Sequence, residues 1–458
     1  MAKIDFSNFD PAQLKAAQKI AATLKERGFE AVFAGGCVRD ALLGRPLHDI
    51  DIATSASPDE VERIFCGKTV AVGKSFGIIV VRLDGISFDV ATFRADSDYT
   101  DGRHPGQVSF VSAEEDAWRR DFTVNALFCD PLQGEVIDYT GGMADLEKRV
   151  IRAIGEPEAR FAEDHLRMLR AVRFAAVLGF NIDPDTVDAI RVHREWIDTV
   201  SAERVASEFT RMLCESPVPS RGLKMLLETG MLKRFLPEVA AYRGVRQPPQ
   251  FHPEGDVWNH VTQMLDDIPA PRSPELAWAV LLHDIGKPKT FTERFEPRYG
   301  CVRIRFINHA DVGTGMAREI LLRLKMPTAF IDTVCNVVAN HMRFINASEM
   351  RGAKLRRFMG TEYFPVLLAV IRLDLLHSNG DLRPWKYLNA SYQSYRDRPI
   401  LPEPIVKGRD LIAWGVPPGK KMGGLLTRLY DAQLEGKIDS PESAKAFLEK
   451  NGLLDYNA

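Results

Sequence analysis

Two aspartates, Asp49 and Asp51, are separated by one residue and alternate with Ile50 and Ile52. In a β-strand successive side chains point to opposite faces, so both carboxylates would share one face and both isoleucines the other. Adjacent carboxylates repel each other unless a cation lies between them, and Mg²⁺ prefers oxygen ligands and completes its shell with water and substrate phosphates. The spacing indicates metal-dependent phosphoryl transfer. An exposed acidic strand edge is the commoner explanation of an isolated Asp-x-Asp.

A glycine pair precedes these aspartates. Gly35 and Gly36 follow the apolar run AVFA, which predicts a strand, and without a Cβ they would let backbone N–H groups approach an anion such as a phosphate. Residues 37 to 43 are expected to form a short helix that ends at Gly44. We therefore interpret residues 35 to 54 as a catalytic core.

The segments around this core predict a small mixed sheet with helices. A helix is expected over residues 11 to 27, where apolar residues recur at helical spacing. A short helix over residues 58 to 65 and the strand-like runs TVAV, GIIVVRL and ISFDVATFR follow. The last run contains Asp89, which could join the metal pair or accept a proton from an attacking hydroxyl. Position alone equally allows an exposed strand acid.

Residues 35 to 54, GGCVRDALLGRPLHDIDIAT, closely resemble the nucleotidyltransferase signature of the class II tRNA nucleotidyltransferase (CCA-adding enzyme) and bacterial poly(A) polymerase family. The resemblance covers nearly all of residues 25 to 380. It implies that a tRNA 3′-hydroxyl attacks the α-phosphate of CTP or ATP, that pyrophosphate leaves, and that the protein selects the base without a nucleic-acid template. The implied catalytic residues are Asp49, Asp51 and Asp89, with Mg²⁺ on the first two. Gly35, Gly36 and Arg39 would contact the nucleotide.

A second motif of the family is matched by residues 119 to 126, RRDFTVNA. Arg120 and Asn125 suit phosphate and ribose contacts, because arginine supplies a fixed fork of donors and asparagine can both donate and accept. We include Asp121 with them among the expected nucleotide-binding residues.

Residues 94 to 111, RADSDYTDGRHPGQVSFV, form a polar segment that is long for a connector inside a compact domain. The segment resembles the flexible loop that, in this family, is thought to help the site switch from CTP to ATP. It modestly favours CCA addition and argues against an enzyme that adds only C. An ordinary hairpin excursion is the alternative.

Residues 161 to 174, FAEDHLRMLRAVRF, match the family's nucleotide-reading motif Glu-Asp-x-x-Arg. Asp164 and Arg167 would share one helical face. A carboxylate only accepts hydrogen bonds and a guanidinium only donates them, so the pair could bind adenine or cytosine and reject guanine and uracil. By spacing alone, a helical salt bridge is the favoured explanation. Arg170 and Arg173 are also expected to bind the nucleotide.

A third motif, Glu-Arg-x-x-x-Glu, is matched by Glu203, Arg204 and Glu208. We assign these residues a structural role, bracing neighbouring helices through ion pairs without contact to the substrate.

A second set of candidate metal ligands follows residues 242 to 253, whose prolines and glycine predict a linker. A single histidine on an apolar helix is usually a core residue, but here imidazole and carboxylate groups, good ligands for transition metals, recur in order. The series resembles the HD phosphohydrolase domain, which implies that metal-activated water attacks a phosphate ester with help from Lys287. A retired domain that only binds RNA is the alternative. The implied ligands are His260, His283, Asp284 and Asp374 for one metal, and His309 and His341 for a second.

Composition limits the remaining choices. A chain of 458 residues predicts about three domains, and 45% hydrophobic with 27% charged residues is typical of a soluble protein. No run approaches the ~18 apolar residues of a membrane helix, and the N-terminus lacks a secretory signal, so we expect a cytoplasmic protein without a membrane partner. The formal charge of −2 means that any RNA surface must come from local basic patches.

The predicted fold is an α+β nucleotidyltransferase head, with a small mixed sheet and helices, followed by an all-α neck, an HD domain and a helical tail. The expected boundaries are 1–150 for the head, 151–241 for the neck, which would select the nucleotide and bind RNA, 252–380 for the HD domain, and 381–458 for the tail. The predicted activity is Mg²⁺-dependent addition of C, C and A to tRNA from CTP and ATP, with HD phosphohydrolase activity left open. The alternatives are a poly(A) polymerase or A-adding enzyme, and an HD phosphohydrolase with an RNA-binding head.

Overall fold

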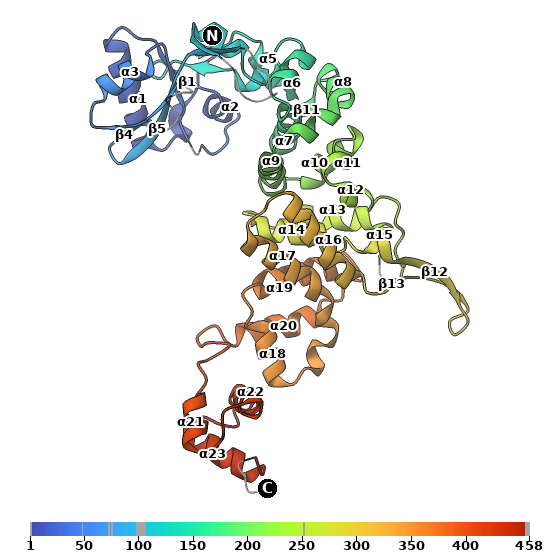
Figure 1. Ribbon diagram of the computed structural model, residues 1–458. Helices are drawn as coiled ribbons and strands as arrows, with labels where there is room; N and C mark the ends of the chain where they lie inside the picture. The colour runs from blue at the N-terminus through green and yellow to red at the C-terminus, as the bar shows by residue number, and fades with distance from the viewer. Residues whose placement is uncertain are drawn as a thin grey trace. The chain divides into compact units, whose positions relative to one another are not determined.

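The computed structural model describes residues 2–47, 49–71, 74, 77–97, 107–250 and 252–453. The chain divides into two compact units, Met1–Ala240 and Ala241–Ala458 (Figure 1). Within the described ranges, no helix has the length and apolar character needed to cross a membrane.

A seven-stranded mixed sheet lies at the centre of the first unit, in the order β3-β4-β5-β2-β1-β8-β9. β2 and β5 run parallel, and every other neighbouring pair is antiparallel. The prediction of a small mixed sheet is confirmed. The strands are β1 (Ala31–Ala34), β2 (Ile52–Thr54), β3 (Thr69–Val70), β4 (Ile78–Leu83), β5 (Ile86–Thr92), β8 (Phe128–Cys129) and β9 (Val136–Ile137).

Helices begin and end in the head where the sequence predicts them. In α1 (Pro11–Glu26), the Asp10 carboxylate accepts a hydrogen bond from the Gln13 N–H at 2.8 Å, which satisfies a donor of the first turn. The other head helices are α2 (Gly36–Leu42), α3 (Pro58–Ile64) and α4 (Ala113–Trp118). Both α3 and α4 start with a capping box, at Ser57 and Ser112.

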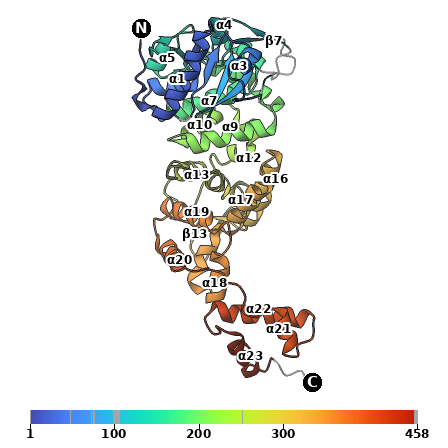
Figure 2. The same cartoon turned by 90° about the vertical axis from the view of Figure 1, so that its left-hand side faces the viewer.

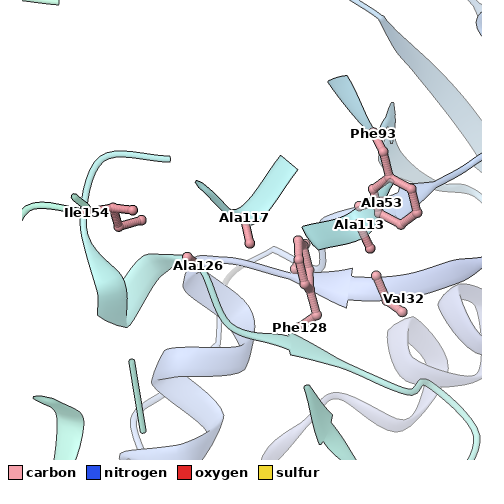
Figure 3. Close-up of a cluster of buried hydrophobic side chains, with 9 residues drawn as sticks. Val32, Ala53, Phe93, Ala113, Ala117, Ala126, Phe128 and Ile154 are labelled. Atoms are coloured by element: carbon pink, nitrogen blue, oxygen red, sulfur yellow. The ribbon is translucent and has the colours of Figure 1, made fainter. Parts of the chain in front are cut away.

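The core of the head follows from strand alternation. Val32 and Ala34 of β1 contribute to a buried cluster with Phe93, Phe128 and α4 (Figure 3). Phe33 points to the opposite face, where the centre of its ring lies 6.1 Å from the ring centre of Phe6 and 6.4 Å from that of Phe9. Both faces of β1 are therefore buried, which fixes the strand that precedes the glycine turn.

The two ends of the segment predicted as a flexible loop, residues 94 to 111, pair with each other as the strands of a β-hairpin. β6 (Arg94–Ser97) pairs antiparallel with β7 (Gln107–Phe110). The middle of the predicted loop, residues 98–106, lies outside the described residues.

The remainder of the first unit is helical, as expected, with one short parallel strand pair, β10 (Val150–Ile151) and β11 (Asn181–Ile182), that the sequence analysis missed. Gly222 permits the close approach of three helices, since a Cβ there would lie 2.5 Å from the Met212 sulfur and 3.1 Å from the Ala176 Cβ. The helices are α5 (Gly142–Lys148), α6 (Pro157–Glu163), α7 (Arg167–Leu178), α8 (Pro184–His193), α9 (Ala202–Glu215), α10 (Pro219–Glu228), α11 (Leu232–Phe235) and α12 (Pro237–Ala240).

The second unit begins with a bundle built around α14, whose residues 277 to 282 are completely buried. The segment predicted as a linker packs against this bundle, because the buried Tyr242 donates its hydroxyl hydrogen to the Leu281 carbonyl at 2.8 Å. The helices are α13 (Val257–Asp266), α14 (Pro274–Leu282), α15 (Lys287–Thr290), α16 (His309–Arg323), α17 (Thr328–Asn340), η5 (His341–Glu349), α18 (Gly352–Met359), α19 (Phe364–Leu376) and α20 (Arg383–Gln393).

A β-hairpin, formed by β12 (Phe291–Glu296) and β13 (Cys301–Phe306), interrupts these helices between α15 and α16. The sequence analysis did not predict this hairpin. The run CVRIRF alternates apolar and polar residues with period two, and that signal was available in the sequence.

Three tail helices, α21 (Gly408–Ala413), α22 (Lys420–Leu434) and α23 (Pro441–Lys450), close around a small core of their own (Figure 2). Leu411, Leu429 and Leu448 lie at its centre. Arg356 of α18 donates hydrogen bonds to the carbonyls of Leu434 and Ile400, which joins the tail to the rest of the second unit.

Candidate functional site

Two of the three predicted catalytic carboxylates come just before β2, and the third lies in the neighbouring strand β5, in the middle of the head sheet. β2 begins at Ile52, so Asp49 and Asp51 immediately precede the strand in which they were expected. The alternation still holds, because Ile50 and Ile52 are buried while both aspartates are exposed. Ile52 pairs with Val90 of the parallel strand β5, which places Asp51 beside Asp89.

The negative charges of Asp49, Asp51 and Asp89 repel one another. Partial loss of hydration raises the pKa of Asp51, the neighbouring Asp89 and Asp49 raise it further, and only Arg120 opposes them. Clustered carboxylates of this kind are stabilised by a cation, and oxygen donors suit Mg²⁺. The donor set therefore fits the metal that the sequence implies.

A cavity of about 620 Å³ opens beside Asp49 and Asp51. Its walls come from the glycine turn, α2, the RRD segment, α7 and α9, and the described cationic side chains in them are all arginines. Such a wall suits a ligand with several phosphates, because each guanidinium offers a fixed fork of donors. The arginines are Arg39, Arg119, Arg120, Arg167, Arg170, Arg173, Arg204 and Arg211.

Gly35 is required by the position of Arg120. Its φ of +73° is in the left-handed region, and a Cβ would lie 3.0 Å from the Arg120 Nη1. The Gly35 N–H donates to the Leu127 carbonyl at 3.0 Å, so it is not free to bind a phosphate as predicted. Arg120 is fixed by hydrogen bonds from Nε and Nη2 to the Asp116 carboxylate, at 3.1 and 3.0 Å.

A hydrogen-bonded chain fixes the remaining residues of the second motif. Arg39 donates from Nη1 to the Asn125 Oδ1 at 2.5 Å, Asn125 donates from Nδ2 to the Asp121 Oδ1 at 3.1 Å, and Arg170 donates to the Asp121 Oδ2 at 2.6 Å. Burial opposes ionisation of Asp121, but Arg170 and Asn125 outweigh it and lower its pKa to about 2. Asp121 therefore lies at the cavity as a charged anchor for Asn125 and Arg170.

Asp164 and Arg167 do not share one helix, contrary to the prediction. α6 ends at Glu163, Asp164 has an extended backbone with φ of −144°, and α7 begins at Arg167. The Asp164 carboxylate accepts from the Arg204 Nη2 at 2.8 and 3.1 Å, whereas Arg167 pairs with Glu163. The alternative of a helical Asp164–Arg167 salt bridge is thus contradicted, and both side chains line the cavity.

The third motif braces the helices, and part of it also reaches the cavity. Glu208 pairs with Arg173 at 2.5 Å, which leaves Arg173 only 2% exposed, and Glu203 is exposed. Arg204 was expected to be purely structural, yet it lines the cavity through its contact with Asp164. Arg211 of the same helix also lines the cavity and was missed, because the 3.6-residue periodicity that could have placed it there was not followed beyond the motif.

The six predicted HD ligands converge in one cluster in the second unit. The two oxygens of Asp284 face different histidines. Oδ2 lies 3.2 Å from the His283 Nε2 and 4.0 Å from the His260 Nε2, and Oδ1 lies 3.6 Å from the His309 Nε2 and 3.8 Å from the His341 Nε2. Asp374 lies 3.2 Å from the His260 Nε2.

Backbone carbonyls orient three of these imidazoles. The Nδ1 atoms of His283, His309 and His341 lie 2.7 to 2.9 Å from carbonyls one turn earlier in the chain. A carbonyl only accepts, so Nδ1 carries the hydrogen and Nε2 points a lone pair into the cluster. The Nε2 atoms of His309 and His341 are 3.1 Å apart, close enough for both to bind one metal ion.

The electrostatics of His341 agree with a ligand role. Burial, together with the neighbouring His283, lowers the pKa of His341 to about 4, so its imidazole is neutral at pH 7. A neutral imidazole such as that of His341 and an ionised carboxylate suit a divalent transition metal.

The sequence analysis missed the residues that support this cluster. The Glu254 Oε1 lies 2.8 Å from the His260 Nδ1 and 2.9 Å from the His252 Nδ1, and Gln247 accepts a hydrogen bond from the Lys287 Nζ at 2.6 Å. Most of them lie in the segment predicted as a linker, where no periodic pattern marks them.

Three family models match consecutive parts of the chain: the poly A polymerase head domain over residues 31–152, a probable RNA and SrmB-binding site of polymerase A over residues 179–243, and the HD domain over residues 256–378. A CCA-adding enzyme of Lactobacillus johnsonii is 32% identical over 438 residues, which span 95% of this chain and 96% of that relative. The chain belongs to the CCA-adding enzyme family. The resemblance inferred from the motifs is confirmed, and the chain is a tRNA nucleotidyltransferase.

Other members of the CCA-adding enzyme family are also similar to this chain in sequence and fold. The enzyme of Geobacillus sp. strain WCH70 is 49% identical over 210 residues, 46% of this chain and 51% of its own. A solved structure, the Bacillus stearothermophilus CCA-adding enzyme in complex with CTP, matches with a TM-score of 0.73 and 30% identity, covering 98% of this chain and 100% of that one. The Thermotoga maritima enzyme complexed with tRNA shares the fold, with a TM-score of 0.57 and 20% identity. Nucleotidyltransferase and HD domains are metal-dependent, in keeping with the acidic and histidine clusters.

Proposed function

We propose that this protein adds C, C and A to the 3′ end of tRNA from CTP and ATP, and that Mg²⁺ is the metal of the head. The observation that carries the proposal is the cavity that Asp49, Asp51 and eight arginines line together. Its relative from Bacillus stearothermophilus was solved with CTP, which supports a nucleoside triphosphate as the ligand.

Asp49 and Asp51 would hold Mg²⁺, which when bound lowers the pKa of the attacking hydroxyl and screens the triphosphate. Asp89, beside Asp51 in the register of β2 and β5, would accept the proton of the tRNA 3′-hydroxyl. Arg39 and Arg120 would bind phosphate oxygens. Their ion pairs orient them before substrate arrives, so little reorganisation is needed during the reaction.

Asn125 retains the capacity to bind a ribose hydroxyl. Its Oδ1 has a second lone pair beside the bond from Arg39, and its Nδ2 has a second hydrogen beside the bond to Asp121. Asp121 and Arg170 would act as positioning residues through this chain of bonds, and Gly35 and Gly36 would leave room for the phosphates and for Arg120.

Asp164 and Arg167 would read the base edge. Asp164 has further acceptor capacity beside its bonds from Arg204, and Arg167 has further donors beside its bonds to Glu163 and to backbone carbonyls. The exocyclic amino group of cytosine or adenine would donate to Asp164, while guanine and uracil would present a carbonyl there. Arg173, a residue of α7 that is buried against Glu208 of α9, would hold these two helices together.

The test is extension of three tRNA transcripts, ending before CCA, after C and after CC, with each nucleotide alone and with CTP plus ATP. Completion of CCA on all three supports the proposal. Unlimited A-tailing would instead identify a poly(A) polymerase, addition to the CC end alone would identify an A-adding enzyme, and no addition would refute nucleotide transfer.

The geometry of Asp284 favours a second activity, metal-dependent hydrolysis of phosphate esters. One oxygen of Asp284 faces His260 and His283, and the other faces His309 and His341, so Asp284 could bridge two ions. Lys287, whose Nζ lies 2.6 Å from the Asp284 Oδ2, would bind the ester phosphate. Opening of a 2′,3′-cyclic nucleotide by water to a nucleoside monophosphate, tested with added divalent metals, checks this activity. Absence of turnover with every metal would refute it.

A further inference from the structure

The β12–β13 hairpin projects from the helices of the second unit and has two unlike faces (Figure 1). Cross-strand partners share a face, so the register sorts the side chains. One face is mainly apolar and the other is mainly basic. The apolar face holds Phe291, Glu293, Phe295, Val302, Ile304 and Phe306, and the basic face holds Thr292, Arg294, Glu296, Cys301, Arg303 and Arg305.

The basic face carries positive charge that the hairpin does not neutralise. Arg294 lies directly opposite Arg303, and like charges in that arrangement destabilise a strand pair. The Glu296 carboxylate is bound by Arg305 at 2.6 Å. Among the residues that the structure describes, no carboxylate forms an ion pair with Arg294 or Arg303. The hairpin's own stability therefore does not account for these two arginines.

An exposed aromatic ring lies among these charges. Tyr299, in the turn between the strands, is 51% exposed. The Arg303 guanidinium lies 4.3 Å and the Arg298 guanidinium 5.7 Å from the centre of its ring. Proteins that bind unpaired RNA combine an aromatic surface, on which a base stacks, with cations that bind the phosphates on either side.

The hairpin also adjoins the HD cluster. Ile304 and Phe306 line a cavity of about 640 Å³ that is also lined by His309 and Asp284. Arg305 of the basic face lines the same cavity, so a polyanion bound along that face would lie beside the cavity in which phosphate esters would be hydrolysed.

We infer that the β12–β13 hairpin is an RNA-binding arm, in which Arg294, Arg298 and Arg303 bind backbone phosphates and Tyr299 stacks on an unpaired base. The inference rests on the proposed function, in which tRNA is the substrate, and it adds a contact surface outside the head. An acidic protein partner would use the charges but would have no need of the exposed ring between them.

The experiment measures binding of a fluorescently labelled tRNA transcript to the full chain at several salt concentrations. R294Q/R303Q should raise the Kd several-fold and reduce the slope of log K against log salt by about 1.4 to 1.8, the value for two lost phosphate contacts. R318Q/R357Q is the matched control, because it removes two positive charges from exposed side chains elsewhere in the second unit. Its slope should equal that of the wild type.

Y299A tests the same face without a change of charge and should weaken binding of a single-stranded RNA roughly five-fold or more. An unchanged slope in R294Q/R303Q together with unchanged binding by Y299A overturns the inference. So does loss of self-association or of protein binding by the variants while RNA binding stays intact. Failure of the proposed function can be distinguished from failure of this inference. In that case the wild type would not add CCA, whatever its affinity for RNA.

Discussion

The ion pair between Asp164 and Arg204 offers the sharpest test of how the head chooses a base. Arg204 is the cation that holds the Asp164 carboxylate, with Nη2 to oxygen distances of 2.8 and 3.1 Å. Replacement of Arg204 by methionine keeps most of the side-chain volume but removes both hydrogen bonds. Asp164 would then be free to turn toward Arg167 and would no longer present a fixed acceptor to the base.

The size of the effect follows from burial. The two side chains are 20% and 24% exposed, so the pair lies between a surface pair, worth about 0 to 1 kcal/mol, and a buried pair, whose disruption costs about 3 to 5 kcal/mol. We take about 1.5 to 3 kcal/mol, as for a hydrogen bond to a charged group. If all of it were expressed in base choice, discrimination against GTP and UTP would fall by roughly ten-fold to one-hundred-fold.

The assay is single-turnover incorporation of each nucleotide into a tRNA that ends before CCA, for the wild type, R204M, D164A and the double variant. R204M should relax base choice, and the double variant should be no less selective than D164A, because Arg204 acts through Asp164. R211M is the control, since Arg211 also lines the cavity but pairs with Glu215. Equal losses with all four nucleotides, or additive effects in the double variant, would show that Arg204 binds the triphosphate directly and would refute the reasoning.

Three further predictions concern single sites. D51N should abolish nucleotide addition and leave any phosphate-ester hydrolysis intact, whereas D284A should do the reverse; loss of both activities in either variant would mean that the two sites are not independent. G35A should lower kcat/KM for addition at least ten-fold, because the left-handed backbone and the 3.0 Å approach of Arg120 leave no room for a methyl group, and unchanged kinetics would contradict this. G222A should lower the free energy of unfolding by about 1 to 3 kcal/mol, measured by urea titration, with G315A, a helical glycine without a positive φ whose Cβ would contact nothing within 4 Å, as the control for added methyl groups; equal changes in both would refute the packing argument.

Local pattern was sufficient for much of the head. The alternation of Asp49 and Asp51 with isoleucines predicted which side chains would be buried, because a strand has a fixed period of two. The glycine turn, α1 and the capping boxes were likewise predictable from neighbouring residues. The β12–β13 hairpin shows that the same signal can be overlooked inside a region assigned to helices.

The sequence by itself determined the family, the order of the head and HD regions and the residue types able to bind metal and phosphate, since these depend on motifs and on periodicity along the chain. Only the tertiary structure decided which partner each charge takes. Asp164 pairs with Arg204, forty residues away, rather than with Arg167, and Asp284 turns its two oxygens to two different pairs of histidines. Ion pairs and metal clusters depend on distances in space that packing alone establishes, and spacing along the chain does not contain them.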